Sequence, residues 1–400
     1  MANHEELIQN FTQWTKENGV VWGNYVLRYD GPESGYGLFA TKCSRMNEDI
    51  IDIPDSLLIT GAKIASMRKY EGIAKRVKLT PLEMLILFFA YEPTDQKTKF
   101  KPYFDILPKK FYTPVLDMPD LVPEHLPNEM KAFLIGQKAE LALVVEKFSQ
   151  IEELKNLDRA RINWAWQLVN TRCIYVENEP NCLLDNTDGD TIAVIPLVDM
   201  LNHDSNAACL GHHYKSIHRY RVSTASTSVR EGNQIFVCYG GHENCRLWLE
   251  YGFKLADNIH NRIKVSHELL FSLLARFKLV PTSGMKKAIL EANYPFTIFS
   301  SDSEPTFSMR ANIRFLLLED IELQNWKKSF YVISEERIAV MEKKENEIIR
   351  KVLILLGTTM NSKKQSVAEE VKWIWEEYAS VVDEYVKNWD NKLSEQEVDE

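Results

Sequence analysis

The sequence has few cysteines, and none of them forms a pattern typical of a metal site or a disulfide framework. Its six cysteines are scattered, with no CxxC pair and no histidine at zinc-ligand spacing beside them. Hydrophobic runs are short: none approaches about 18 residues, and the first twenty residues are polar and charged. We therefore expect reduced thiols, no metal site, no membrane span, and a cytoplasmic or nuclear location, or both.

Several catalytic signatures are also absent. The sequence contains no GxSxG, no HExxH, no phosphate-binding loop of the Walker type and no full GxGxxG after a strand. These absences argue against hydrolases, zinc proteases and dinucleotide-binding enzymes. The net charge of −9 provides no global positive field for nucleic acid. We expect no direct nucleic-acid partner, whereas a cationic protein segment would be attracted to the surface.

The chain is long enough to fold around a full core. Its 400 residues with 45% hydrophobic content allow two or three domains. After a predicted helix over Glu5–Glu17, short apolar runs broken by glycine predict small antiparallel strands in Tyr25–Asp52. Thr80, with Pro81 next and Glu83 three residues after the cap, marks a helix start ahead of an apolar run.

Helices dominate the remainder, apart from a second strand region. Helical patterns cover Asn128–Gln150 and Asp158–Thr171, whereas the proline-rich and aromatic-rich stretch Phe100–Pro127 predicts an irregular connection. Strands return at Thr191, and from about Ala256 the apolar spacing predicts helices again. These helices are expected over His267–Leu279, Ser334–Leu356 and Gln365–Trp389. The chain should combine a strand-built domain, interrupted by helices, with a helical domain.

Two short segments carry most of the functional signal. The first, Asp199–His203, ends the apolar run Ile192–Val198 in an Asn-His pair, so strand-like backbone would deliver two polar side chains to a turn. The second, Phe236–Gly240, ends a β-branched and aromatic run in Tyr-Gly, with Asn244 following closely. A phenol would therefore stand where a strand stops. Together the two segments suggest a methyl-transfer site.

Six motifs follow one another along the chain in an informative order. They are Gly35-Tyr36-Gly37, Pro102-Tyr103 with Leu107-Pro108, Asn170-Thr171-Arg172, Asp199–His203, Cys238-Tyr239-Gly240 with Asn244, and Leu249-Glu250-Tyr251-Gly252-Phe253. Over most of its length the sequence resembles the SET-domain protein methyltransferases, specifically the class typified by the Rubisco large-subunit lysine methyltransferase. Relatives in this class often have Glu immediately before the first glycine, where this chain has Ser34 next to Glu33.

The resemblance implies an α+β architecture. A SET β-fold, with the Asn-His and Tyr segments packed as a pseudoknot, would be interrupted by a helical insert and followed by an all-α substrate-binding domain. The expected boundaries are 20–60 for the N-terminal part of the SET domain and 61–185 for the insert. The C-terminal part, with the cofactor and catalytic motifs, would cover 186–255, and the helical domain 256–390.

The resemblance also implies S-adenosylmethionine as the cofactor. Carried over by position, the cofactor-binding residues are Ser34, Gly35, Tyr36, Arg172, Asp199, Asn202, His203, Tyr239 and Phe253, and the catalytic residue is Tyr239. Tyr36 would offer backbone contacts, and Arg172 would bind the carboxylate of the cofactor. Asn202 and His203 would hold its amino-acid and adenine parts. Phe253 would pack against the adenine ring.

The residue types suit this chemistry independently of the resemblance. A guanidinium such as that of Arg172 fixes a carboxylate through two parallel charge-assisted bonds, and an adenine needs an aromatic face. Methyl transfer is an in-line displacement that depends on alignment of the reacting atoms. A lysine acceptor must first lose a proton from an ammonium whose pKa is about 10.4. Tyr239 would position that amine, and the sequence leaves open whether it is also the base.

Simpler interpretations compete with these roles. Arg172 stands near the end of a predicted helix and could complement the helix C-terminus instead of binding a ligand. Trp164 and Trp166 are assigned to packing rather than to a methyl-lysine cage. For the whole protein, the leading hypothesis is a lysine N-methyltransferase that acts on histone or non-histone protein. A protein-histidine N-methyltransferase and a catalytically idle SET scaffold that binds protein partners are the alternatives, and the oligomeric state stays open.

Overall fold

The computed structural model describes residues 4–207, 209–225, 228–330 and 335–399, and it divides the chain into two compact units. The first unit contains the residues up to Leu121, together with Ala132–His242 and Arg246–Lys254. The second contains Val122–Lys131, Glu243–Cys245 and the residues from Leu255 onward. Each unit is described by itself below.

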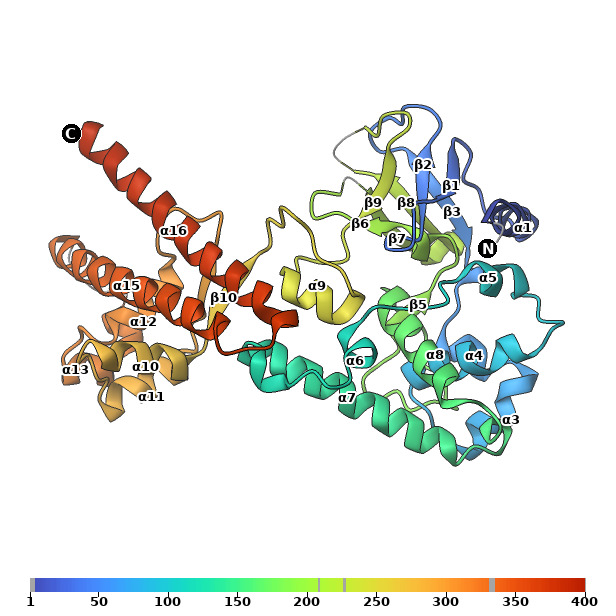
Figure 1. Cartoon of the computed structure of the whole chain (residues 1–400), viewed down its shortest axis with the longest axis horizontal. Helices are drawn as coiled ribbons and strands as arrows, with labels where there is room; N and C mark the ends of the chain where they lie inside the picture. The colour runs from blue at the N-terminus through green and yellow to red at the C-terminus, as the bar shows by residue number, and fades with distance from the viewer. Residues whose placement is uncertain (1–3, 208, 226–227, 331–334, 400) are drawn as a thin grey trace. The chain divides into compact units, whose positions relative to one another are not determined.

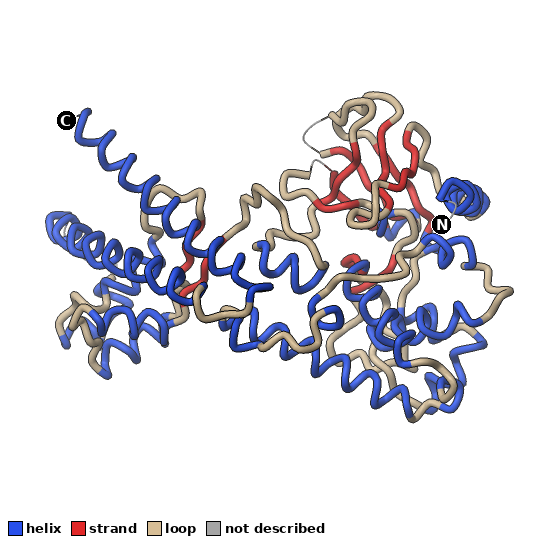
Figure 2. The backbone as a smooth tube through the Cα atoms, in the orientation of Figure 1, coloured by secondary structure: helices blue, strands red, loops and turns tan. Residues whose placement is uncertain are grey.

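A seven-stranded sheet forms one part of the first unit (Figure 2). Its strands are β1 (Tyr25–Tyr29), β2 (Tyr36–Ala40), β3 (Asp49–Pro54), β6 (Asn202–His203), β7 (Cys209–Tyr214), β8 (Arg219–Thr224) and β9 (Gln234–Val237). The order is β1-β2-β9-β7-β8-β3, with β6 beside β9. Strands from both ends of the unit's sequence therefore share one sheet. Strands β1, β2 and β3, in antiparallel pairings, confirm the small antiparallel strands predicted in Tyr25–Asp52, and Leu38 of β2 is fully buried.

The Asn-His segment and the Tyr segment lie side by side, as the predicted SET fold requires. Strand β6 pairs with β9 in parallel, with Asn202 opposite Phe236 and His203 opposite Val237. The expectation that Asn202 and His203 occupy a turn is wrong. They form a two-residue strand, because β9 offers them backbone hydrogen-bonding partners that a local sequence pattern cannot reveal.

Helices fill the rest of the first unit (Figure 1). They are α1 (His4–Glu17), α2 (Gly61–Ala65), α3 (Arg68–Arg76), α4 (Pro81–Tyr91), α5 (Lys101–Ile106), α6 (Pro114–Asp117) and α8 (Arg159–Arg172), while α7 (Asn128–Ser149) and α9 (Asn244–Tyr251) have residues in both units. A small sheet joins β4 (Cys173–Tyr175) to β5 (Ile192–Val194). Helix α4 has the predicted capping box between Thr80 and Glu83, and its side chains from Met84 to Ala90 are all buried.

The expectation of an irregular connection over Phe100–Pro127 is wrong in part, because α5 and α6 lie within it. Pro102 and Pro114 stand in the first turns of these helices. A proline is tolerated there because the first backbone N–H groups of a helix have no intrahelical acceptor. The prolines that suggested a loop therefore begin helices.

The second unit is predominantly helical, as predicted. It holds α10 (His267–Arg276), α11 (Ser283–Ala292), α12 (Phe307–Arg314), α13 (Asp320–Gln324), α14 (Trp326–Ser329), α15 (Glu335–Lys364) and α16 (Lys372–Asp399), and a two-stranded sheet of β10 (Arg262–Val265) and β11 (Phe296–Phe299) that the sequence pattern did not predict. Helix α15 continues past the predicted end at Leu356. Gly357 stays helical there, and a Cβ at this position would lie 3.5 Å from Val382 of α16.

Candidate active site

Two cavities of the first unit meet at Tyr239. One, which we call the turn cavity, is lined by the glycine turn 32–36, by residues of the segment 106–112, and by Asn202 and Phe253. The other, the cysteine cavity, has a volume of about 380 Å³ and is lined in part by three thiols. These are Cys173, Cys209 and Cys238. Five residues line both cavities: Thr171, Arg172, Asp199, Tyr239 and Tyr251.

The glycine turn forms one wall of the turn cavity. Gly35 has a φ of +66°, a left-handed conformation that glycine adopts without steric cost. Asn202 secures the turn from the neighbouring strand, because its Nδ2 donates to the carbonyl of Tyr36 at 3.3 Å and to Oε1 of Gln234 at 2.7 Å. The Tyr36 hydroxyl is hydrogen-bonded to Nδ1 of His4 at 2.8 Å. The backbone of the glycine turn is thus held beside Asn202 of β6.

An aromatic wall lies at the other side of Tyr239. The ring centroid of Tyr251 is 5.1 Å from that of Tyr239, and the ring centroid of Phe253 is 6.1 Å from that of Tyr251. Gly252 between them has a φ of +86°, and a Cβ there would lie 2.9 Å from the backbone carbon of Tyr112. Only glycine fits this conformation and this close approach. Gly252 therefore allows Phe253 and Tyr112 to line the same cavity.

Tyr239 is held by two hydrogen bonds. Its hydroxyl donates to the carbonyl of Leu201 at 2.7 Å, and its backbone N–H donates to Nδ1 of His203 at 3.1 Å. The pKa of the Tyr239 phenol is raised to about 12, chiefly by burial, with the charge of Arg172 opposing the rise and that of Asp199 adding to it. The phenol is therefore protonated at neutral pH. Since its proton points to Leu201, its oxygen lone pairs are left to accept from another donor.

Arg172, half-buried, pairs with the buried Asp199 at the junction of the cavities. Nη1 of Arg172 donates to the backbone carbonyl of Asp199 and, at 3.2 Å, to its Oδ2. The same Oδ2 accepts from the hydroxyl of Tyr103 at 2.8 Å, and the Asp199 side chain has no solvent exposure. Burial raises the pKa of the Asp199 carboxyl, against the lowering effect of Arg172 and Tyr103. Oδ1 of Asp199 and Nε of Arg172 are buried without a hydrogen-bond partner within the described residues.

His203 lies behind the wall of the turn cavity. Its ring centroid is 5.1 Å from that of Tyr239 and 5.9 Å from that of Phe253. Its Nδ1 accepts from the backbone N–H of Tyr239 at 3.1 Å and lies 3.4 Å from the carbonyl oxygen of Val237. His203 thus packs against Tyr239 and Phe253, and it is buried.

The structure gathers the predicted site residues around one pair of cavities. Ser34, Gly35, Tyr36, Arg172, Asp199, Asn202, Tyr239 and Phe253 line the turn cavity, and His203 packs against two of them. Their cofactor contacts stay predictions. Sequence reasoning gave no role to Tyr103, Tyr112 or Tyr251, although Tyr103 and Tyr251 stand in two of the six motifs. Their positions in these motifs could have indicated that Tyr103 and Tyr251 belong to the site.

The fold and this arrangement of residues define a class of protein. The model of the SET domain matches residues 35–240, and the chain belongs to the SET domain family. The predicted resemblance is thereby confirmed, and with it the SET fold interrupted by helices.

Curated relatives extend over most of the chain. SET domain-containing protein 4 of Homo sapiens is 29% identical over 84% of this chain and 78% of its own length. The ribosomal lysine N-methyltransferase of Schizosaccharomyces pombe is 26% identical over 68% of this chain and 67% of its own length. The actin-histidine N-methyltransferase of Xenopus tropicalis is 23% identical over 81% of this chain and 56% of its own length.

Solved structures share the fold. A structure of Rubisco LSMT bound to sinefungin and monomethyllysine superposes with a TM-score of 0.59 at 18% identity, covering 100% of this chain and 93% of that chain. A structure of Rubisco LSMT bound to AdoMet gives a TM-score of 0.58 at 18% identity, covering 98% of this chain and 92% of that chain. At this identity the likeness concerns the fold.

Two features are missing from the part of the chain that the structure describes. Among the described residues, no three or more His, Cys, Asp or Glu side chains gather where they could hold a metal ion. Within the same ranges, no helix combines the length and apolar character needed to cross a membrane.

Proposed function

We propose that this protein is a protein-lysine N-methyltransferase that uses S-adenosylmethionine. The observation that carries the proposal is the meeting of two cavities at Tyr239, a half-buried phenol whose proton is committed to Leu201. A transfer between two molecules needs their reacting atoms held in line from opposite sides. The name of the Schizosaccharomyces pombe relative, a ribosomal lysine N-methyltransferase, and the ligands of the Rubisco LSMT structures support the same reaction.

The turn cavity offers what the cofactor needs. Nε of Arg172 is a buried donor without a partner in the described chain, suited to a carboxylate. The glycine turn presents backbone of Tyr36, and Phe253 presents an aromatic face for an adenine ring. The cavity measures about 150 Å³, below the usual range for a ligand of this size, so we expect side chains at its rim to move on binding. Tyr112, 47% exposed, is the candidate.

The cysteine cavity is assigned to the acceptor side chain. When bound, the cofactor supplies an electrophilic methyl group. The acceptor amine must be neutral, and burial among apolar and aromatic walls favours the neutral form. Tyr239 accepts a hydrogen bond from this amine through its free lone pairs. Because its pKa is raised to about 12, the phenol positions the amine and leaves proton removal to another acceptor.

The test is transfer of labelled methyl from S-adenosylmethionine to proteins of a cell extract, with labelled residues located by mass spectrometry. Tyr239→Phe should lower turnover at least about 100-fold while calorimetry gives unchanged affinity for S-adenosylhomocysteine. Tyr214→Phe is the matched control, because Tyr214 is exposed and should leave turnover unchanged. Cofactor binding without any label, in wild-type protein and all extracts, would instead favour an idle scaffold that binds protein partners.

Protein-histidine N-methylation is a second candidate, favoured by the similarity to actin-histidine N-methyltransferases. The two acceptors differ in pH dependence. The rate with lysine should keep rising between pH 7 and 9, because the free ammonium has a pKa of about 10.4. The rate with histidine should level off above about pH 7, since the imidazole is then neutral. Initial rates with Lys-containing and His-containing peptides separate these two reactions.

Substrate and location complete the proposal. We propose a histone or non-histone protein as the substrate, with no direct nucleic-acid partner and no membrane association. The expected location stays cytoplasmic, nuclear or both. Imaging of the tagged chain tests the location, and mass spectrometry of the labelled extract identifies the substrate.

A further inference from the structure

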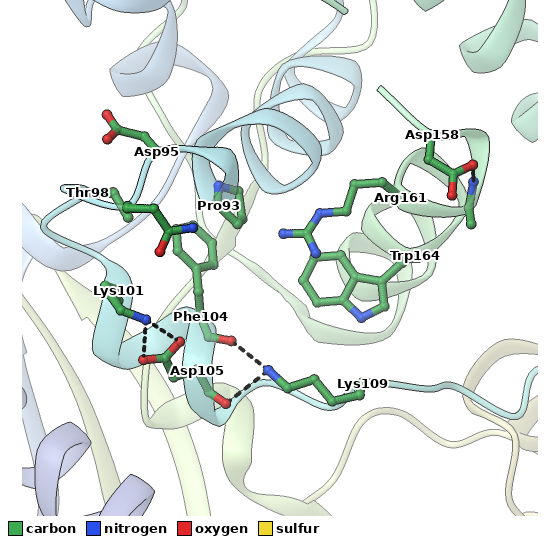
Figure 3. Close-up of a pocket in the computed structure, with 12 residues that line it drawn as sticks. Pro93, Asp95, Thr98, Lys101, Phe104, Asp105, Lys109, Asp158, Arg161 and Trp164 are labelled. Carbon is green, nitrogen blue, oxygen red and sulfur yellow. Dashed lines mark hydrogen bonds and ion pairs between the residues drawn. The ribbon is translucent and has the colours of Figure 1, made fainter. Parts of the chain in front are cut away.

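A third cavity lies in the helical part of the first unit, apart from the cavities at Tyr239. It has a volume of about 560 Å³, within the range of small-molecule sites. Figure 3 shows Phe104 and Pro93 on one side, Arg161 and Trp164 on the other, and Lys101 and Lys109 along the lower edge. We call it the insert cavity. Its walls include the two aromatic rings of Phe104 and Trp164, and its polar side chains are mostly charged.

The acidic residues around the insert cavity are already engaged. Asp105 binds Lys101, with both carboxylate oxygens 2.9 Å from Nζ. Asp158 caps helix α8 by accepting from the backbone N–H of Ala160 at 3.1 Å. Asp95 lies 3.9 Å from Nζ of Lys69. These carboxylates therefore balance other charges or a helix end.

Two cations at the cavity have no carboxylate partner within ion-pair distance in the described part of the chain. Nζ of Lys109 donates to the backbone carbonyls of Phe104 and Asp105, at 3.3 and 3.0 Å (Figure 3). Nε of Arg161 donates to the carbonyl of Ala90 at 3.4 Å, which uses one of its five N–H donors. Lys109 is exposed as a whole, but partial desolvation of its ammonium at the cavity lowers the pKa of this lysine, and the nearby charges of Arg161 and Lys101 lower it further, against Asp105. An anion between Lys109 and Arg161 would relieve this repulsion.

The walls also select the shape of a ligand. The guanidinium of Arg161 lies over the ring of Trp164, 4.6 Å from its centroid, and the indole Nε1 donates to the carbonyl of Pro108 at 2.8 Å. Trp164 is therefore held in place, with the guanidinium of Arg161 over its ring and the ring centroid of Phe111 6.5 Å away, and Phe104 is a buried ring on the facing side (Figure 3). Flat aromatic walls favour a flat, apolar body in the ligand.

We propose that the insert cavity binds a small organic anion with a planar aromatic body. Its carboxylate or phosphate is held by Lys109 and Arg161, and its ring packs between Phe104 and the stacked side chains of Arg161 and Trp164. The site is separate from the proposed cofactor and acceptor sites. Different residues of the segment 104–112 line the insert cavity and the turn cavity, so the ligand touches a shared wall.

The test is an NMR titration of the whole chain labelled with ¹⁵N at tryptophan. The indole signal of Trp164 is identified by its loss in Trp164→Phe. The probe is naphthalene-2-carboxylate, with naphthalene-2-methanol as the neutral match and inorganic phosphate as an anion without a ring. We expect the carboxylate to shift the Trp164 signal at concentrations at least about tenfold lower than either comparison compound.

Variants locate the anion. Lys109→Gln and Arg161→Gln should each weaken binding of naphthalene-2-carboxylate at least about tenfold. Lys101→Gln is the matched control, because Lys101 lines the same cavity but is paired with Asp105, and it should change the affinity less than about threefold. The other indole signals report whether Arg161→Gln still folds, and Lys109 is exposed and follows helix α5.

Several results would overturn the proposal. If naphthalene-2-methanol binds as tightly as naphthalene-2-carboxylate, the cavity is an apolar pocket without an anion site. If Lys101→Gln and Lys109→Gln weaken binding of the carboxylate equally, the effect is one of general charge and Lys109 has no specific role. A hexaglutamate peptide is tested in the same way. If it shifts the Trp164 signal at lower concentration than naphthalene-2-carboxylate, the ligand of this cavity is an acidic protein segment and not a small molecule. None of these measurements depends on methyl transfer.

Discussion

Arg172 donates two hydrogen bonds to Asp199, one to the backbone carbonyl and one of 3.2 Å to a carboxylate oxygen that also accepts from Tyr103. This pair joins the last residue of helix α8 to the segment that leads into β6. Both residues line both cavities. Arg172 is thus more than a complement to a helix end, because a buried carboxylate fixes where its guanidinium points.

The contact between Arg172 and Asp199 predicts that the effects of substituting the two residues on stability are not additive. Arg172→Ala should abolish most cofactor affinity and also destabilise the fold by about 3 kcal/mol, because Asp199 is left buried and unpaired. Adding Asp199→Asn should restore roughly half of that stability without restoring affinity. Urea unfolding and calorimetry with S-adenosylhomocysteine measure the two effects. Additive losses of stability would show that the two side chains act independently.

The phenol of Tyr239 should stay protonated well above the usual range of tyrosine. Burial raises its pKa to about 12, so ionisation should be absent at pH 10, where an exposed tyrosine is half ionised. The measurement is tyrosinate absorbance at 295 nm, recorded as the difference between wild type and Tyr239→Phe. A difference signal that develops around pH 10 would contradict the raised pKa of this phenol.

Gly252 should tolerate no side chain. Gly252→Ala places a Cβ 2.9 Å from the backbone of Tyr112 at a φ of +86°, and should cost about 2–4 kcal/mol of stability and weaken cofactor binding. Gly136→Ala is the control, because Gly136 lies in helix α7 and a Cβ added there would meet nothing within 4 Å. The control should stabilise by up to about 1 kcal/mol. Thermal unfolding measures the change in stability of each variant. Equal changes in Gly252→Ala and Gly136→Ala would show that the close approach to Tyr112 is not the cause.

The second unit contains a buried ion pair between helices α12 and α15. Nε of Arg314 lies 2.6 Å from Oε1 of Glu345, and the two side chains are 8% and 0% exposed. Glu345→Gln should destabilise this unit by about 3–5 kcal/mol, because Arg314 is left buried without its counter-charge. The double variant Arg314→Met with Glu345→Leu should lose less. The measurement is urea unfolding monitored by circular dichroism. A loss of unfolding free energy below about 1 kcal/mol in Glu345→Gln would contradict the burial of the pair.

Local chemistry explains which elements were predictable. The capping box of Thr80 and Glu83 and the long helix α7 follow from residues a few positions apart, and both appear where expected. The region Phe100–Pro127 was misjudged because proline marks a loop and a first helical turn equally well. The strand pair β10 and β11 was missed because each strand has four residues amid helical patterns.

The sequence by itself determined the SET family, the alternation of strands and helices, and the residues gathered at Tyr239, because six ordered motifs and local periodicity are written along the chain. The tertiary structure alone decided that Tyr103 binds Asp199 across 96 positions, that Asn202 and His203 form a strand beside β9, and that Lys109 and Arg161 face one cavity. Such contacts depend on how distant elements pack, and no local propensity encodes the partner of a buried polar atom.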